Sequence, residues 1–172
     1  RGETFVTRKI TRAVARISAG VQERVYLGNL DAKRDWGHAS DFVEGMWRIM
    51  QQDKPEDFVL STGVTTTIRE FTKRAFEQVD IKVEWFGTGI NEIGRDVNNG
   101  NIIVSVDPTY FRPTEVDILI GDSSKAREKL NWEPTLDLQG MIEEMVKKDL
   151  EETHKDKLLY KGGFEVKSRN QD

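Results

Sequence analysis

Residues 24–47 read RVYLGNLDAKRDWGHASDFVEGMW, and they contain a strand, a charged turn-rich segment and a helix in succession. The first six residues alternate in hydropathy and are rich in strand formers, after which Gly28 and Asn29 indicate a turn. From residue 40 the apolar side chains recur every three or four positions, which predicts an amphipathic helix. We therefore expect residues 28–39 to form a loop between a strand and a helix, a position where loops often carry function.

The helix after this loop is expected to begin at Ser40 or Asp41, since either side chain can accept hydrogen bonds from the free amides of the first turn. It is expected to end near residues 53–55. Within the loop, Trp36 is expected to pack and His38 to form a structural hydrogen bond. The predicted buried face of the helix consists of Phe42, Val43, Met46, Trp47 and Met50.

The rest of the chain shows the same two periodicities. Further helices are predicted at residues 4–17, 67–76, 122–130 and 138–150. Further strands are predicted at residues 57–61, 81–86 and 102–106. Residues 87–100 are expected to form a polar loop, and the residues from 153 onward a loosely attached tail. Strands and helices therefore alternate, which indicates an α/β fold.

The composition predicts a soluble globular protein. The 172 residues are 37% hydrophobic and 33% charged, and they are enough for one core. No apolar run approaches the roughly 18 residues of a membrane span, and the first ten residues lack the apolar core of a secretory signal. We expect a cytoplasmic protein that does not bind a membrane. Because there is no cysteine and the two His residues are far apart, we expect no metal site.

The charge is unevenly distributed along the chain. The net charge is −4, but residues 1–35 hold eight Arg or Lys against four Asp or Glu, a balance of about +4. A locally basic segment in an acidic protein favours a compact anion, such as the phosphates of a nucleotide, over a long polyanion. We therefore expect no nucleic-acid partner. The alternative is that these side chains only lie on a solvated helix face.

A small set of side chains can recognise a nucleotide. Guanidinium groups form paired hydrogen bonds to phosphate oxygens, and Lys acts as a compact positive charge. The candidate cations are Lys9, Lys33, Arg34 and Arg112. Glu115 follows Arg112 by three residues and can accept hydrogen bonds from two ribose hydroxyls.

Each candidate also has a purely structural interpretation. Lys9 can be solvated, and Arg34 can pair only with Asp31 or Asp35. Glu115 can simply neutralise the arginine three positions earlier.

The sequence contains no complete catalytic motif. GTGINEIG at residues 87–94 looks like a dinucleotide-binding loop, but a polar segment follows it instead of the apolar helix that such a loop requires. There is no GxxxxGK[ST] phosphate loop and no YxxxK pair of the kind that short-chain dehydrogenases use. We therefore expect binding chemistry in this chain and no catalytic residue.

Several separate segments carry a family resemblance. They read RGETFVTRKITRAVARI (1–17), YLGNLDAKRDWGHASDFVEGMW (26–47), EDFVLSTG (56–63), YFRPTEVD (110–117) and KLNWEP (129–134). In this order they resemble the C-terminal half of the GDP-mannose 4,6-dehydratases, a family of extended short-chain dehydrogenases/reductases. The resemblance runs from Arg1 to about Leu150, and the later KLLYKGGFEV resembles the bacterial forms.

The resemblance implies an NADP-dependent lyase of nucleotide-sugar metabolism. The family converts GDP-mannose to GDP-4-keto-6-deoxymannose, a step of GDP-fucose biosynthesis, by oxidation at C4, loss of water across C5 and C6, and return of the hydride to C6. Its catalytic Thr, Glu and YxxxK residues lie upstream of Arg1, so the chain alone is expected to be inactive. The family also implies a homodimer or homotetramer.

The resemblance assigns binding roles to individual positions. Arg1 would contact NADP. The residues that would line the GDP-mannose site are Val6, Lys9, Asn29, Leu30, Arg34, Arg112 and Glu115.

The resemblance also implies a domain organisation. Residues 1–34 and 64–152 would build the substrate-binding domain, with residues 153–172 as a C-terminal tail. Residues 35–63 would add the last helix and strand to a Rossmann-type sheet whose core is not in this chain. Their apolar faces would then lack a partner, so the isolated chain should self-associate or aggregate.

Three other functions remain open at this point. The chain can belong to another nucleotide-sugar epimerase or reductase of the same superfamily, which the presence or absence of Thr and Glu beside YxxxK would decide. It can be a non-catalytic nucleotide-sugar binding module, which should be stable and monodisperse alone. A nucleic-acid role for the basic first helix is the weakest, because the acidic remainder would repel a polyanion.

Overall fold

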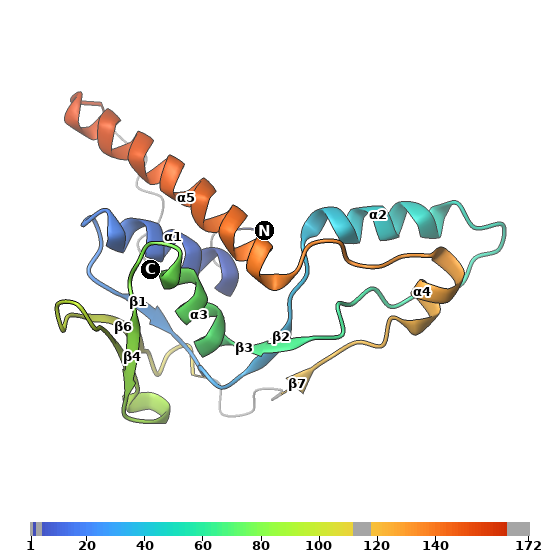
Figure 1. Cartoon of the computed structure of the whole chain (residues 1–172), viewed down its shortest axis with the longest axis horizontal. Helices are drawn as coiled ribbons and strands as arrows, with labels where there is room; N and C mark the ends of the chain where they lie inside the picture. The colour runs from blue at the N-terminus through green and yellow to red at the C-terminus, as the bar shows by residue number, and fades with distance from the viewer. Residues whose placement is uncertain (1, 3–4, 112–117, 165–172) are drawn as a thin grey trace. The chain divides into compact units, whose positions relative to one another are not determined.

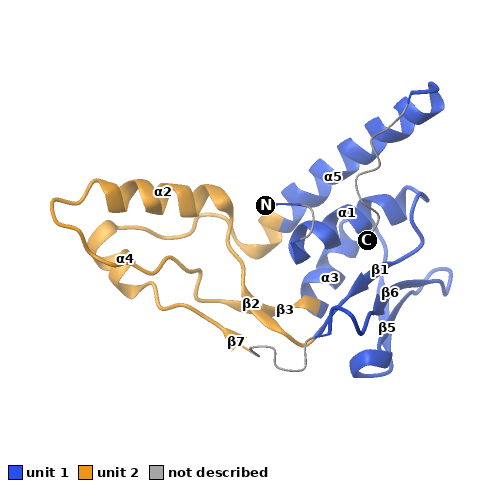
Figure 2. Cartoon of the chain, turned by 180° about the vertical axis from the view of Figure 1, so that it is seen from behind, with its two compact units in different colours: residues 1–30, 69–114, 142–172 blue, residues 31–68, 115–141 orange. Residues whose placement is uncertain are grey.

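The computed structural model describes residues 2, 5–111 and 118–164 (Figure 1). Arg1, Arg112 and Glu115 lie outside these residues. The chain divides into two compact units, shown in different colours in Figure 2. Unit 1 consists of residues 1–30, 69–114 and 142–172, and unit 2 of residues 31–68 and 115–141.

Unit 1 contains a mixed four-stranded sheet. Its strands are β1 (Val25–Leu27), β4 (Val83–Phe86), β5 (Ile93–Asp96) and β6 (Ile102–Val106). Their order is β1-β6-β5-β4, with β1 and β6 parallel and the other pairs antiparallel. A short 3₁₀ helix, η1 (Gly89–Asn91), connects β4 to β5.

Three helices belong wholly or mostly to unit 1: α1 (Val6–Ser18), α3 (Ile68–Glu77) and α5 (Leu138–Lys161). The apolar stripes of these helices and the sheet supply the core. Its fully buried members include Ile10, Val14, Phe71, Phe76, Val104 and Ile142. Each such side chain contributes roughly 1.5–3 kcal/mol when it leaves water, so this shared interior holds the helices to the sheet.

Unit 2 contains a small three-stranded sheet and two helices. The strands are β2 (Lys33–Asp35), β3 (Thr65–Thr67) and β7 (Ile118–Leu119), in the order β3-β2-β7. The helices are α2 (Ala39–Met50) and α4 (Ser124–Leu130). A compact cluster of Ala126, Leu130 and Trp132 packs against the half-buried Ile49, Phe58 and Leu60.

All five predicted helices are present, and so are the strands predicted near residues 24–29, 81–86 and 102–106. The first helix ends as expected, because Gly20 adopts a φ of +71°, which L side chains rarely take. The helix predicted at residues 138–150 is longer than expected. It continues to Lys161, so the prediction of a loose tail from residue 153 is wrong for residues 153–161.

Three predictions about strands are wrong. The loop at residues 28–39 contains β2, and the predicted loop at residues 87–100 contains β5. Conversely, residues 57–61 form no strand, because no described segment pairs with them in a ladder of hydrogen bonds. The periodicity of apolar residues cannot identify a charged strand of three residues such as β2. It also cannot show that a predicted strand lacks a pairing partner.

The predicted face of α2 is also wrong. The buried positions of this helix are Asp41 and Gly45, whereas four of the five apolar residues expected inside are exposed. These are Val43, Met46, Trp47 and Met50, which we call the α2 apolar face. The N-cap is His38 and not Ser40 or Asp41, so the helix begins earlier than expected, at Ala39. Nδ1 of His38 accepts from the Ser40 amide at 3.3 Å. The prediction that His38 forms a structural hydrogen bond is confirmed.

Candidate functional site

Two parallel strands of unit 1 end at the same edge of the sheet. Residues 28–30 follow β1, and residues 107–110 follow β6. The amide of Asp107 donates to the carbonyl of Leu27 at 2.9 Å, which keeps the two segments together beyond the ladder. In open α/β sheets, ligands bind outside the carboxyl ends of parallel strands, so this edge is the candidate site.

Lys9 of α1 reaches this edge. Its Nζ lies 3.9 Å from the centre of the Tyr110 ring, a distance at which a cation is attracted to the ring face. Asp107 accepts hydrogen bonds from the Thr109 amide at 2.8 Å and from the Thr109 hydroxyl. These bonds, and to a lesser degree the charge of Lys9, lower the pKa of Asp107. The edge therefore presents a cation, an ionised carboxylate and an aromatic ring.

A glycine is required where the two segments meet. A Cβ at Gly28 would lie 2.3 Å from the carbonyl oxygen of Tyr110, much closer than van der Waals contact allows. Any side chain at residue 28 must therefore displace Tyr110, which also carries the ring under Lys9. The GNL stretch thus has a steric role besides the binding role that the resemblance assigns.

Four of the seven predicted substrate-binding residues are described residues of unit 1. Val6 lies one helical turn before Lys9, so both can share a face of α1. Asn29 is half-buried in the segment after β1. Leu30 is only 2% exposed, so its side chain belongs to the core and only its backbone can face a ligand.

The two candidate cations of β2 belong to unit 2. Lys33 is exposed, whereas Arg34 is half-buried and donates from Nη1 to the carbonyl of Lys33 at 2.8 Å. The carboxylate of Asp35 accepts from the amides of Thr62 and Gly63 at 3.1 and 2.9 Å. Asp35 thus holds the turn that leads into β3.

Sequence reasoning did not include Asp107 and Tyr110 among the candidate site residues. One available signal is their position directly after β6, which corresponds to the position of Asn29 after β1. The parallel pairing of β1 with β6 makes that correspondence meaningful, and the pairing is not visible in the sequence.

The basic residues of α1 mostly face acidic residues of α5. Arg8 Nη2 lies 2.9 Å from Asp149 and 3.0 Å from Glu152. The residues that line one small polar pocket beside this pair are Arg12, Arg16, Asp149, Glu152, Thr153 and Asp156. The local positive balance read from the sequence is therefore largely compensated within unit 1, and it does not by itself indicate a bound anion.

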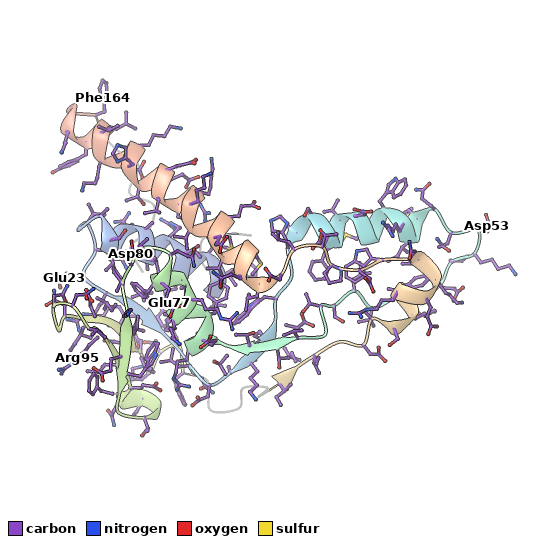
Figure 3. All side chains as sticks on the ribbon, viewed as in Figure 1. Glu23, Asp53, Glu77, Asp80, Arg95 and Phe164 are labelled. Carbon is purple, nitrogen blue, oxygen red and sulfur yellow. The ribbon has the colours of Figure 1, made fainter. Side chains whose placement is uncertain are left out.

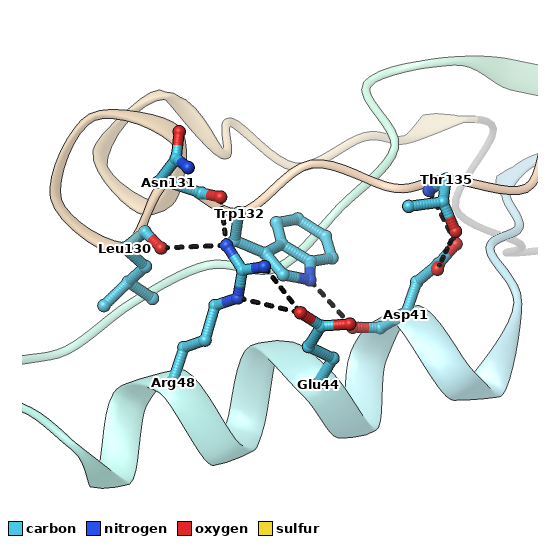
Figure 4. Close-up of polar contacts among 7 residues, drawn as sticks. All are labelled: Asp41, Glu44, Arg48, Leu130, Asn131, Trp132 and Thr135. Carbon is cyan, nitrogen blue, oxygen red and sulfur yellow. Dashed lines mark hydrogen bonds and ion pairs between the residues drawn. The ribbon is translucent and has the colours of Figure 1, made fainter.

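A second polar cluster holds unit 2 together (Figure 4). Asp41 accepts from the Thr135 hydroxyl at 2.6 Å and from the Thr135 amide at 3.0 Å, while Trp132 Nε1 donates to the Asp41 carbonyl at 2.7 Å. Burial opposes ionisation of Asp41, but the bonds from Thr135 and Leu136 outweigh it and lower its pKa. Arg48 links the far end of α2 to the carbonyls of Leu130 and Asn131 and to Glu44.

Among residues 2, 5–111 and 118–164, no group of three or more His, Asp or Glu side chains is placed to hold a metal ion. No helix in the same ranges is long and apolar enough to cross a membrane.

A family model described as GDP-mannose 4,6 dehydratase matches residues 1–145. The chain belongs to this family. A GDP-mannose 4,6-dehydratase of Sinorhizobium fredii is 58% identical over 150 residues, which are 87% of this chain and 43% of that protein. The human GDP-mannose 4,6 dehydratase is 51% identical over 151 residues, 88% of this chain and 41% of that protein. This member of the dehydratase family thus spans less than half the length of these relatives.

Solved structures with low sequence identity share the fold of this dehydratase-family chain. RMD from Pseudomonas aeruginosa, in complex with NADPH, aligns over 88% of this chain and 44% of its own, with a TM-score of 0.71 and 16% identity. The dTDP-glucose 4,6-dehydratase from Bacillus anthracis, in complex with NAD, aligns over 90% and 42%, with a TM-score of 0.64 and 15% identity. The predicted α/β fold of an extended short-chain dehydrogenase/reductase is confirmed.

Proposed function

We propose that this chain is the GDP-mannose-binding part of a GDP-mannose 4,6-dehydratase. The observation that carries the proposal is the family match over residues 1–145. The edge formed by Lys9, Asp107 and Tyr110 supports it, because this edge lies at the carboxyl ends of β1 and β6 and holds one of the predicted phosphate-binding cations. The intact enzyme would convert GDP-mannose to GDP-4-keto-6-deoxymannose.

The roles of the chain in this reaction are binding and orientation. The charge of Lys9 and the guanidinium groups of Arg34 and Arg112 would hold the diphosphate. Glu115 would accept hydrogen bonds from the ribose hydroxyls. Asn29 and the backbone of Leu30 would contact the nucleotide. The oxidation at C4, the loss of water and the hydride return to C6 need groups outside this chain, so the chain alone would be inactive.

NADP is the proposed cofactor. It would supply the hydride acceptor at C4 and the hydride donor at C6. The one residue that the resemblance assigns to it, Arg1, lies outside the described residues, so this part of the proposal rests on the family and on the NADPH complex of RMD.

The domain organisation is part of the same proposal. Residues 1–34 and 64–152 would form the substrate domain, and residues 35–63 would return to a nucleotide-binding sheet formed by an upstream half. Two features support this: the α2 apolar face is exposed, and residues 57–61 form no strand ladder with any described segment. A homodimer or homotetramer in the cytoplasm completes the proposal.

Calorimetry on the full-length protein tests the binding role. Arg34→Ala and Arg112→Ala should each weaken GDP binding about tenfold or more, because each removes a charge-assisted hydrogen bond to phosphate. The matched controls are Lys73→Ala in α3 and Arg127→Ala in α4, which change exposed cations and should stay within about twofold. Normal GDP affinity in both Arg34→Ala and Arg112→Ala would remove the basis of the assignment.

Product analysis separates the dehydratase from an epimerase or reductase of the same superfamily. The full-length protein with GDP-mannose and NADP should yield a 4-keto-6-deoxy sugar nucleotide. A product that keeps the C6 hydroxyl would instead favour the other enzymes of the superfamily.

A further inference from the structure

The N-terminus of α1 has no side-chain cap hydrogen bond among the described residues. The N-cap residue is Phe5, which has no side chain able to accept a hydrogen bond, and no acidic residue lies in the first turn. The free amides and the positive end of the helix dipole are therefore not satisfied in the usual local way by the described residues. Contacts with other elements can also hold this turn in place.

Arg8 provides such a contact, and it joins α1 to α5. Its Nη2 lies 2.9 Å from Asp149 Oδ1 and 3.0 Å from Glu152 Oε2, and the Arg8 side chain is 20% exposed. Asp149 is 1% exposed, and the groups that most favour its charged form are the nearby Thr11 hydroxyl and the Arg8 guanidinium. Moving Arg8 away would leave a buried carboxylate uncompensated, which is strongly unfavourable.

The surroundings of Asp149 support a fixed arrangement. Burial raises its pKa, while the Thr11 hydroxyl, Arg8 and Arg12 act in the opposite direction. The charged groups that face it from α1 and α5 are Arg8, Arg12, Arg16, Glu152 and Asp156. The Arg8–Asp149 ion pair lies between two helices whose apolar residues are in the same core. Because an ion pair is directional, it restricts the rotation and axial position of α1 more than apolar packing does alone.

Lys9 follows Arg8 directly on α1. Since neighbouring residues on a helix point about 100° apart, Arg8 can face α5 while Lys9 faces the sheet edge and the Tyr110 ring. A small rotation of α1 would move Lys9 Nζ relative to Tyr110 and Asp107. We propose that Asp149 is a positioning residue for the substrate site: by holding Arg8, it fixes Lys9 at the carboxyl ends of β1 and β6. This inference rests on the proposed function.

A double-mutant cycle on the full-length protein tests the inference, with GDP as the probe in calorimetry. Lys9→Ala and Asp149→Asn should each raise the Kd for GDP about threefold to tenfold. If Asp149 acts through Lys9, then Asp149→Asn in the Lys9→Ala background should change the Kd by less than about twofold. Multiplicative effects, or an unchanged Kd in Asp149→Asn, would overturn the inference.

The matched control is Glu151→Gln, which removes a carboxylate from an exposed position two residues along the same helix. It should leave the Kd for GDP within about twofold of the wild type. If Asp149→Asn does not fold, Glu152→Gln removes the other partner of Arg8 at a more exposed position, and the same non-additivity with Lys9→Ala is expected. Additive effects in that cycle would overturn the inference equally.

The outcome separates this inference from the proposed function. Weak GDP binding in Arg34→Ala and Arg112→Ala together with normal binding in Lys9→Ala would keep the proposed function and reject the role of Asp149. Normal binding in all three would reject both. A steady-state measurement adds a second criterion: Asp149→Asn should raise KM for GDP-mannose and leave kcat within about twofold, since no reacting group is removed.

Discussion

Helices α1 and α2 carry the same apolar periodicity but use it in opposite ways. In α1 the stripe is inside, and Ile10 and Val14 are fully buried in the core of unit 1. In α2 the side chains of Trp47 and Met50 are 62% and 79% exposed. The face of α2 that contacts the rest of unit 2 is the one with Asp41 and Gly45. Periodicity therefore predicts the helix and its apolar face, but not whether a partner for that face is present.

The contacts of α2 explain how it stays in place without burying its apolar face. Gly45 allows a close approach, since a Cβ there would lie 2.6 Å from Leu60 Cδ1 and 2.9 Å from Trp132 Nε1. Polar bonds then secure both ends of the helix, through Asp41 at one end and Arg48 at the other (Figure 4). Unit 2 is thus held by a few specific contacts, whereas unit 1 has a larger apolar core.

The largest expected effect concerns the centre of unit 2. Trp132 is 1% exposed and both packs in the apolar cluster and donates to the Asp41 carbonyl. Trp132→Ala should destabilise unit 2 by about 3–5 kcal/mol, because it removes a large buried side chain and leaves a cavity. Hydrogen exchange measured by mass spectrometry should show faster exchange in α2 and α4, with little change in the strands of unit 1.

The control for this variant is Trp47→Ala on the α2 apolar face. The same change of residue type at an exposed position should alter the stability of the isolated chain by less than about 0.5 kcal/mol. If Trp132→Ala reduced the protection of amides against hydrogen exchange equally in both units, the stability of unit 2 would not depend on the cluster around Trp132.

Local signals account for what the sequence predicts correctly. The helices predicted at residues 4–17 and 67–76 follow from the spacing of apolar side chains within a few residues of one another. The strand β2 does not, because its sequence KRD has no apolar alternation. Its pairing partners Thr65–Thr67 and Ile118–Leu119 lie about 30 and 85 residues away, and long-range pairing leaves no local pattern.

The candidate site was predictable to the same extent. Lys9 and Asn29 could be chosen from the sequence because of their residue types and the family resemblance. Tyr110 and Asp107 could not, since their relation to Lys9 depends on the parallel pairing of β1 and β6. The facing charges of α1 and α5 show why the basic first segment does not by itself indicate a bound anion: Arg8 and its partner Asp149 are 141 positions apart in the sequence.

The next effect, of intermediate size, tests the α2 apolar face directly. If this face normally meets another part of a longer protein, the isolated 172-residue chain should self-associate through it. Trp47→Glu should then weaken self-association about tenfold, because it places a charge where apolar surface would be buried. Analytical ultracentrifugation over a range of concentrations measures this.

Ile90→Glu is the matched control, since Ile90 is 52% exposed on η1 of unit 1. It should leave the association constant of the isolated chain unchanged. A monodisperse wild-type chain at all concentrations would instead favour a free-standing binding module. Self-association through the end of α5, where Phe164 is exposed (Figure 3), would be identified by an effect of Phe164→Glu and none of Trp47→Glu.

The smallest expected effect is a difference in the pH response of the two units. Hydrogen bonds from Thr135 and Leu136 lower the pKa of Asp41 despite its burial, so its contribution to the stability of unit 2 is present above its usual pKa near 3.8. That contribution is lost as the pH falls through the lower pKa of the folded state. Burial raises the pKa of Asp149 in the folded state. Its contribution to the stability of unit 1 is therefore complete below about pH 3.8, and it is lost as the pH rises through the higher pKa of the folded state.

The stability contributions of the two carboxyl groups are isolated by comparing the wild-type chain with Asp149→Asn and with Asp41→Asn at the same pH. As the pH rises from 4 to 7, Asp149→Asn should gain stability relative to the wild type in α1 and α5, because ionisation of the buried carboxylate disfavours the folded state. Asp41→Asn should show no such gain in α2 over that range, and its deficit should shrink only below about pH 4. Amide exchange at matched pH measures both. An Asp149→Asn difference that is constant with pH would mean that Arg8 and Arg12 fully offset the burial of Asp149, and the pair would then stabilise unit 1 as well as position α1.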